Sequence, residues 1–400
     1  MVRTMLALRS LLGSARSVQR SRTRVPHLPD RPFRGRTTPP DAAAPDRLPG
    51  DGLLPDDAVL LDAPDERLGP ALVAAALGDH EPAAVLLAAT RAAAEWESRD
   101  RYVTRLAAFA RGRDEWLTRW LAAAPEDPDA LLVHAQLAVR RAWESPARAE
   151  RLREVAPLIE AAAGATPADP VPWRLALDHA RGADSPESAF ETCWEQAVRR
   201  SPRHFGCHVS ALTYLSPRWH GSYRAGFDFA EQAAADAGPD SLIRTLPALA
   251  AHTQLRGTRS GGPGTSGRVH GDTRPGGERT SGERTGGERA ERNGAVPDER
   301  LDAAADLAIG LSARYAPGDP WPAEARNVLA YVLIGRARWE AALDQFRLIG
   351  PFATSFPWAA GGDDPLGRFL DARAGARVAR ALAEPLPGSA GRGRYGDHYA

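Results

Sequence analysis

Apolar side chains recur every three or four residues over most of this chain, which is the spacing of one face of an α-helix. Alternating apolar and polar runs, the mark of strands, are missing, and β-branched residues are sparse. The pattern predicts an all-α protein. Three or four of its helices are expected between residues 298 and 384. The helices predicted before them cover 83–96, 101–112, 114–124, 130–143, 147–164, 171–181, 186–200, 205–215, 223–237 and 240–255.

Three turns of the form Pro-x-Asp-Pro, at 125–128, 167–170 and 317–320, separate predicted helices. In each turn the first Pro ends one helix, the Asp caps the next, and the second Pro takes its first position. Ser201-Pro202 is a degenerate fourth member. Successive turns begin 42 and 35 residues apart, and the last step is 73 once a 42-residue Gly-rich segment is set aside. Such a period, with two helices per step, is typical of helical solenoids.

Composition changes along the chain predict five segments. The Gly-rich segment contains twelve Gly and a repeated Gly-Glu-Arg motif, which is typical of a flexible linker. Because the turn period survives its removal, we expect the linker to be an insertion into one array. The segments are a disordered basic leader (1–50), a helical-repeat array (52–255), a disordered Gly/Arg-rich linker (256–297), C-terminal helices that continue the array or dock on it (298–384), and a disordered tail (385–400).

Three segments resemble the second-helix half of a tetratricopeptide repeat. Residues 194–202 read Trp-x2-Ala-x4-Pro, 339–346 read Trp-x2-Ala-x3-Phe, and 223–230 read Tyr-x2-Gly-x3-Ala. In that family small residues admit a close helix crossing, and the aromatic fills the gap beside it. Asp178 and Arg181 depart from the family pattern, because a small residue and a Tyr are usual at these first-helix positions.

The resemblance covers about residues 125–255 and 298–350, and it implies antiparallel helix pairs stacked as a tetratricopeptide-like α-solenoid. The block at 216–222 also resembles a segment of uncharacterised bacterial helical-repeat proteins. Repeat arrays present a long concave surface whose usual ligands are extended or helical peptides. We therefore predict a non-enzymatic protein-interaction scaffold that binds a peptide or protein partner.

The candidate partner-binding residues are aromatic and basic side chains near the turns. Trp219 lies in a turn before Gly221, so it is either a ligand-facing rim or a plug over the end of a helix pair. The full set is Trp173, Arg174, Arg218, Trp219, His220 and Tyr223.

Charge is spread unevenly along a chain that is neutral as a whole. All 51 basic residues are Arg, residues 1–40 carry +8 and the linker carries +3, so the remaining body carries about −11. An acidic body argues against nucleic-acid binding through the folded part. No apolar run approaches the roughly 18 residues of a membrane span.

Residues 1–24 suggest an alternative, a peripheral membrane-associated adaptor. In a helix, Met5, Leu8 and Leu12 would lie on one side, with basic residues beside them. A short basic amphipathic helix of this kind can make weak contact with an anionic membrane. The basic residues are Arg9, Arg16 and Arg20.

No catalytic, cofactor-binding or metal-binding residue is predicted. Two Gly-x-Gly-x-x-Gly matches, at 262–267 and 391–396, lie in low-complexity sequence without the strand and helix that a phosphate site needs. A Walker-type phosphate loop is excluded because the chain has no lysine.

One group of His and Cys residues leaves a further alternative open, an enzyme or metal-binding protein with a site in the His204–His220 region. Its spacing matches no zinc module, and its cysteines lie among apolar neighbours. Cys207 with His204 or His208 could instead be a nucleophile pair. Two cysteines make no disulfide framework and fit a reducing compartment, so a cytoplasmic location is expected. The group is Cys193, His204, Cys207, His208 and His220.

Overall fold

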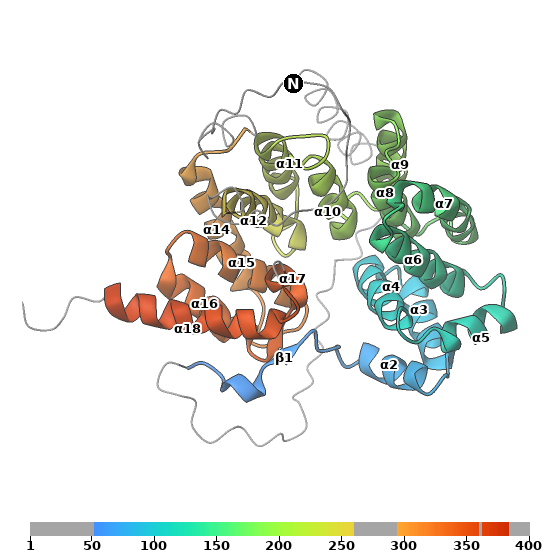
Figure 1. Ribbon diagram of the computed structural model, residues 1–400, viewed down its shortest axis with the longest axis horizontal. Helices are drawn as coiled ribbons and strands as arrows, with labels where there is room; N and C mark the ends of the chain where they lie inside the picture. The colour runs from blue at the N-terminus through green and yellow to red at the C-terminus, as the bar shows by residue number, and fades with distance from the viewer. Residues whose placement is uncertain (1–51, 260–293, 360–361, 384–400) are drawn as a thin grey trace, which may run out of the picture. The chain divides into compact units, whose positions relative to one another are not determined.

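The computed structural model describes residues 52–259, 294–359 and 362–383 (Figure 1). Helices dominate these ranges. The only strands in them are two strands of two residues each, so the predicted all-α class is confirmed. The predicted leader and tail lie outside the described residues, as does most of the predicted linker. None of the described helices is long and apolar enough to cross a membrane.

The described chain divides into two compact units. The first unit comprises residues 63–259 and 294–314, and the second comprises 52–62, 315–359 and 362–383. The predicted segment boundaries at 255 and 298 do not coincide with this division.

The first unit contains helices only. They are α2 (Leu68–Ala76), α3 (Glu81–Ala92), α4 (Trp96–Ala110), α5 (Glu115–Ala123), α6 (Pro128–Glu144), α7 (Arg148–Ala165), α8 (Val171–Gly182), α9 (Glu187–Arg200), α10 (Phe205–Tyr214), α11 (Tyr223–Ala235), η2 (Leu242–Thr245), α12 (Leu246–Arg259) and α14 (Asp298–Ser312).

The second unit has a small strand pair beside its helices. Its elements are η1 (Asp56–Ala58), β1 (Leu60–Leu61), α15 (Ala323–Gly335), α16 (Trp339–Ile349), β2 (Phe352–Ala353), α17 (Ser355–Trp358) and α18 (Pro365–Ala383).

The predicted break between two helices is misplaced. The sequence pattern predicts helices over 83–96 and 101–112, whereas α3 ends at Ala92 and α4 already begins at Trp96. Ala94 has a φ of 52°, a left-handed conformation that ends a helix. Gly is the usual residue there, so an Ala gave no sign of the break.

Helices of the first unit pack both on their sequence neighbours and on the next helix but one. Helix α6 packs against α7 and α8, and α8 packs against α9 (Figure 1). Helices α4, α6, α8 and α10, which we call the four central helices, are also in contact with one another. A continuous apolar core that includes Trp116, Trp120 and Leu132 runs from α2 to α8.

The Asp residues of the first two Pro-x-Asp-Pro turns accept hydrogen bonds at the start of the next helix, as predicted, whereas Asp319 does not cap α15. Asp127 accepts hydrogen bonds from the backbone N–H groups of Asp129 (2.8 Å) and Ala130 (3.0 Å) at the start of α6. Asp169 accepts one from the N–H of Val171 (2.8 Å) at the start of α8. In the third turn, Asp319 accepts from a backbone N–H two residues ahead (2.8 Å), although α15 begins only at Ala323.

Arg99 of α4 lies fully buried between two of these turns. Its Nε donates to Asp169 Oδ2 (2.6 Å), its Nη2 lies 2.6 Å from Asp129 Oδ1, and its Nη1 donates to the carbonyl of Leu87 (2.9 Å). Arg91 pairs with the other oxygen of Asp129 (3.1 Å). Burial raises the pKa of Asp169 even though the Arg99 charge opposes it. This Arg99 cluster (Arg91, Arg99, Asp129 and Asp169) joins α3 and α4 to the N-terminal ends of α6 and α8.

Both ends of the predicted linker are ordered, so its predicted span of 256–297 is too long. Helix α12 continues to Arg259, and Val296 is buried. Gln254 donates to the carbonyl of Val296 (3.0 Å) and accepts from its N–H (2.9 Å). Helices α12 and α14 pack together, which supports an insertion within one unit.

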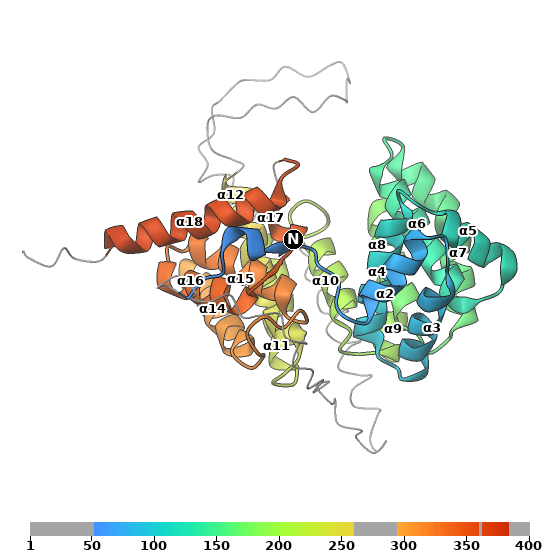
Figure 2. The ribbon, with the colours of Figure 1, turned by 90° about the horizontal axis from the view of Figure 1, so that it is seen from below.

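The second unit is formed by two distant parts of the chain. Leu60 of β1 pairs in parallel with Phe352 of β2, and Asp62 accepts a hydrogen bond from the N–H of Ser355, 293 residues away (3.0 Å). Figure 2 shows β1 beside the C-terminal helices of this unit. Leu53 and Val59 complete the core. Periodicity could not predict this pairing, because a two-residue strand has no pattern.

Arg99→Met should lower the free energy of unfolding by about 3–5 kcal/mol, because two carboxylates would stay buried without their shared cation. Chemical denaturation followed by circular dichroism measures the change. Arg141→Met is the control: its 2.7 Å pair with Asp114 is exposed, so a change below about 1 kcal/mol is expected. Equal effects of the two substitutions would contradict a structural role for the Arg99 cluster.

Candidate functional site

A chain of hydrogen-bonded side chains runs through the packing of the four central helices. Arg174 of α8, only 8% exposed, donates to Asp100 of α4 (2.6 and 3.0 Å) and to Gln136 of α6 (2.5 Å). Arg174 also pairs with Asp178, which accepts from Arg181 (3.1 Å). We call these five residues the polar chain. It leads from the buried interior to Arg181 near the end of α8.

At Arg181 the polar chain meets two tryptophans. Trp143, at the end of α6, and Trp219, in the loop between α10 and α11, lie edge to face with centroids 5.7 Å apart. The Arg181 guanidinium carbon is 4.5 Å from the Trp143 centroid and 5.0 Å from that of Trp219. The corresponding distances for Arg148, at the start of α7, are 5.1 and 5.3 Å. Arg218 lies 6.0 Å from Trp219. These five residues form the Arg–Trp cluster.

Positive charge exceeds negative charge in the Arg–Trp cluster. Arg181 is paired with Asp178, but neither Arg148 nor Arg218 forms an ion pair with any residue that the structure describes. The buried Nε of Arg148 has no hydrogen-bond acceptor within the described ranges. Contact with aromatic faces compensates these cations in part, by roughly 0.5–2 kcal/mol each. The cluster is therefore a half-buried cationic surface lined by aromatic rings.

Two glycines allow the tryptophans to occupy these positions. A Cβ on Gly182, the last residue of α8, would lie 2.5 Å from Trp143 and 2.4 Å from Leu152. A Cβ on Gly221 would lie 2.0 Å from the carbonyl oxygen of Leu215, so the loop that carries Trp219 needs a glycine there. The backbone N–H of Trp219 donates to the carbonyl of Ser216 (3.0 Å), which further holds the loop.

The structure brings only part of the predicted partner-binding set together. Arg218 and Trp219 belong to the Arg–Trp cluster, and Arg174 connects to it through Asp178 and Arg181 but is itself buried. Trp143, Arg148 and Arg181 were missed, although each stands at a predicted helix end. The remaining three lie apart: Trp173 under the Arg200 guanidinium (4.6 Å), His220 stacked on Tyr214 (4.4 Å), and Tyr223 buried beside Gly257.

Trp219 acts more as a plug than as an open rim. It is half-buried and lies against Trp143 and the two arginines at the ends of α7 and α8. This is the second of the two roles expected from its place in the turn. Part of the ring stays accessible, and Arg218 beside it is exposed.

Of the His and Cys residues of the 204–220 region, His204, Cys207 and His208 lie together at the start of α10, whereas His220 stacks on Tyr214. His204 caps α10, where its Nδ1 accepts from the N–H of Cys207 (3.3 Å). His208 packs between Trp194 and Phe229, and burial lowers its pKa to about 4. Within the described residues, no three His, Cys, Asp or Glu side chains are arranged to hold a metal ion.

The two thiols are poorly placed for nucleophilic chemistry. Cys207 is buried, and burial raises its pKa. Burial also raises the pKa of the half-buried Cys193 to about 11. Because the thiolate is the reactive form, both groups are poor nucleophiles at neutral pH.

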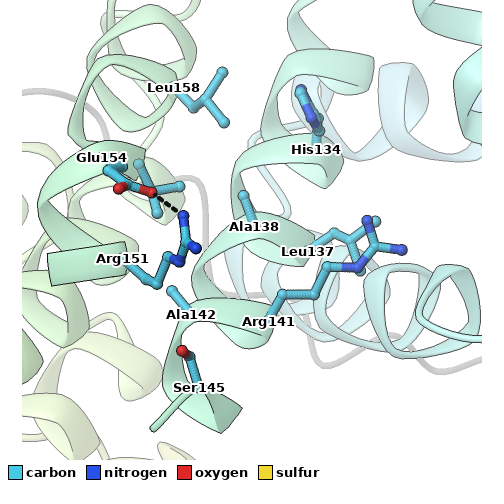
Figure 3. A pocket seen from close by; sticks show the side chains of 10 residues that line it. His134, Leu137, Ala138, Arg141, Ala142, Ser145, Arg151, Glu154 and Leu158 are labelled. Atoms are coloured by element: carbon cyan, nitrogen blue, oxygen red, sulfur yellow. Dashed lines mark hydrogen bonds and ion pairs between the residues drawn. The ribbon is translucent and has the colours of Figure 1, made fainter. Parts of the chain in front are cut away.

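A separate groove of about 380 Å³ lies between α6 and α7 (Figure 3). Its floor is apolar, and the Arg151–Glu154 pair (2.8 Å) lies on the α7 side, facing His134 and Arg141 of α6. Arg141 is paired with Asp114, and burial and the Arg141 charge lower the pKa of His134. The charges around the groove are therefore matched, unlike those of the Arg–Trp cluster.

Comparisons of the chain with protein-family models, with curated proteins and with solved structures found no match. The tetratricopeptide resemblance therefore stays an expectation, and any function rests on the geometry of the site itself.

Gly182→Ala should lower the free energy of unfolding by about 1–3 kcal/mol, because the added methyl displaces Trp143 and Leu152. The same substitution at Gly164, a helical residue of α7 with open space around its Cα, should be neutral or stabilising. Denaturant midpoints with unchanged slopes measure both effects. A stabilising Gly182→Ala would contradict the close packing described at the end of α8.

Because His208 is buried, we expect the stability of the fold to depend on pH. Its pKa is about 4 in the folded chain against about 6.5 when unfolded, so only the unfolded chain takes up this proton between those values. Stability supplied by the neutral ring is thus lost as pH falls from about 6.5 to 4, by up to about 3 kcal/mol. Denaturation of the wild type and of His208→Phe at pH 7 and pH 5 compares the two responses. A substitution that leaves the pH response unchanged would exclude this assignment.

Proposed function

We propose that this chain is a non-enzymatic protein-interaction scaffold that binds an acidic segment of a protein partner at the Arg–Trp cluster. The proposal rests mainly on one observation: Arg148 and Arg218 flank Trp143 and Trp219 without a carboxylate partner among the described residues. Ligand carboxylates would supply the missing counter-charge.

The chemistry of the cluster suits such a segment. Guanidinium groups bind carboxylates through two parallel hydrogen bonds, and this geometry favours Arg over other cations. Trp219 adds apolar contact for side chains between the acidic ones. Arg181 is already held by Asp178 and the two rings, so less conformational freedom is lost on binding.

Helix packing supports a scaffold of the helical-repeat kind. Helices that contact both their sequence neighbour and the next helix but one are the pattern expected of a solenoid. We propose that the first unit is a tetratricopeptide-like array whose partner-binding side carries the Arg–Trp cluster. A half-buried and a buried free cysteine fit a reducing compartment such as the cytoplasm, where we place the protein.

The test replaces two arginines without touching the buried polar chain. Crosslinking mass spectrometry in native lysate should locate partner segments rich in Asp and Glu next to α7 and the α10–α11 loop. A labelled peptide of such a segment should bind the purified chain, and Arg148→Gln with Arg218→Gln should weaken it at least tenfold. Fluorescence anisotropy at low and high salt measures the affinity.

The matched control changes two exposed arginines elsewhere, Arg113→Gln with Arg203→Gln, which removes the same charge. Affinity of this control should stay within about twofold of the wild type. Equal losses in both double variants would show unspecific charge attraction. Crosslinks that avoid the Arg–Trp cluster, or no partner that the purified chain binds, would overturn the proposal.

A further inference from the structure

The first helix pair of the first unit exposes large apolar side chains. Val73 of α2 is 64% exposed, Leu77, directly after α2, is 81% exposed, and Val85 of α3 is 64% exposed. Isolated exposed apolar residues are common, but three on two adjacent helices form a patch of the kind that marks an interaction surface. Helices α2 and α3 pack on each other, and both pack on α4.

The exposed residues follow helical spacing on each helix. Pro70 and Val73 lie on an exposed face of α2, and Glu66 before the helix and Leu77 after it, both exposed, fall at the same helical spacing. Val85 lies on an exposed face of α3 with three other residues, Glu81, Ala89 and Ala92. Both helices pack on each other and on α4, and each turns its exposed face away from these contacts. We call this surface the α2–α3 face.

Unpaired carboxylates border the α2–α3 face. Glu66, Asp79 and Glu81 are exposed, and none of them forms an ion pair with a described residue. Asp79 is engaged only by the backbone N–H of Glu81 (2.9 Å). The surface is therefore apolar in its middle and acidic at its edge, which fits a basic amphipathic helix.

Such a segment exists in the same chain. Residues 1–24, outside the described residues, contain no acidic residue. Met5, Leu8 and Leu12 recur at the spacing of one helical face, and Arg9, Arg16 and Arg20 flank them. We propose that residues 1–24 bind as a helix to the α2–α3 face of their own chain, with the apolar side on Val73, Leu77 and Val85 and the arginines near the carboxylates.

Chain length and charge favour this occupant over others. Residues 25–51, which connect the segment to the described chain, can span roughly 90 Å when extended, so the segment can reach the face. A second copy of the face would place Glu66, Asp79 and Glu81 near their own counterparts, where like charges repel. An anionic membrane would be repelled by the same carboxylates.

The test measures disulfide formation in the full-length chain. Leu8→Cys is combined with Val85→Cys, and the control combines Ser10→Cys, on the opposite side of the predicted helix, with Val85→Cys. The native thiols interfere little, because Cys207 is buried and burial raises the pKa of Cys193 to about 11. After equilibration in a glutathione buffer, peptide mass spectrometry gives the fraction of the disulfide formed within monomers.

The Leu8 pair should form at least ten times more intramolecular disulfide than the Ser10 pair. Neutralising the border with Glu66→Gln, Asp79→Asn and Glu81→Gln should reduce this excess several-fold, as should 0.5 M salt. Circular dichroism of each variant checks the fold, which substitutions at exposed positions should leave intact.

Three results would overturn the proposal. Equal disulfide in the Leu8 and Ser10 pairs would show that the segment does not dock with its apolar side. A disulfide found only between chains would assign the face to a second copy. If the Leu8 pair stays at the control level while Val73→Ser with Leu77→Ser abolishes pelleting with phosphatidylserine–phosphatidylcholine vesicles, the face meets a membrane instead.

Discussion

The arrangement of the first unit depends on one buried guanidinium. Arg99 lies between Asp129, in the first turn of α6, and Asp169, in the turn just before α8. A buried charge is costly unless it is paired with good geometry, so the three groups tolerate little displacement. The spacing of α4, α6 and α8 follows from this constraint.

Asp100, the residue after Arg99, links the buried ion pairs to the Arg–Trp cluster. Asp100 follows Arg99 in α4 and binds Arg174, which holds Asp178 and, through it, Arg181. Because the spacing of these helices is fixed, the Arg181 guanidinium is held in place against Trp143 and Trp219. The Arg–Trp cluster is the outer end of a network that begins in the core.

Local features of the fold could be read from the sequence, and distant pairings could not. Helical periodicity located the helices, and the Pro-x-Asp-Pro form correctly assigned a capping role to Asp127 and Asp169. The second role of Asp169, as partner of a residue 70 positions earlier, leaves no periodic trace. The same holds for the site: aromatic and basic types near turns pointed to Arg218 and Trp219, but only packing shows that Arg174 faces inward. In the sequence, Arg148 and Arg181 are ordinary basic residues at helix ends. Only the fold places both of them against Trp143 and Trp219.

Residues 52–62 belong with the C-terminal helices, so along the sequence the described residues of the first unit fall between the two parts of the second. During synthesis on a ribosome, all of the first unit emerges before the second unit has its remaining parts. Leu53 and Val59 leave the exit tunnel early, but Phe346 and Phe369, which share their core, are synthesised much later. Until translation nears its end, this early apolar segment lacks the side chains that bury it, and a chain truncated before residue 315 would lack β2, the partner of β1.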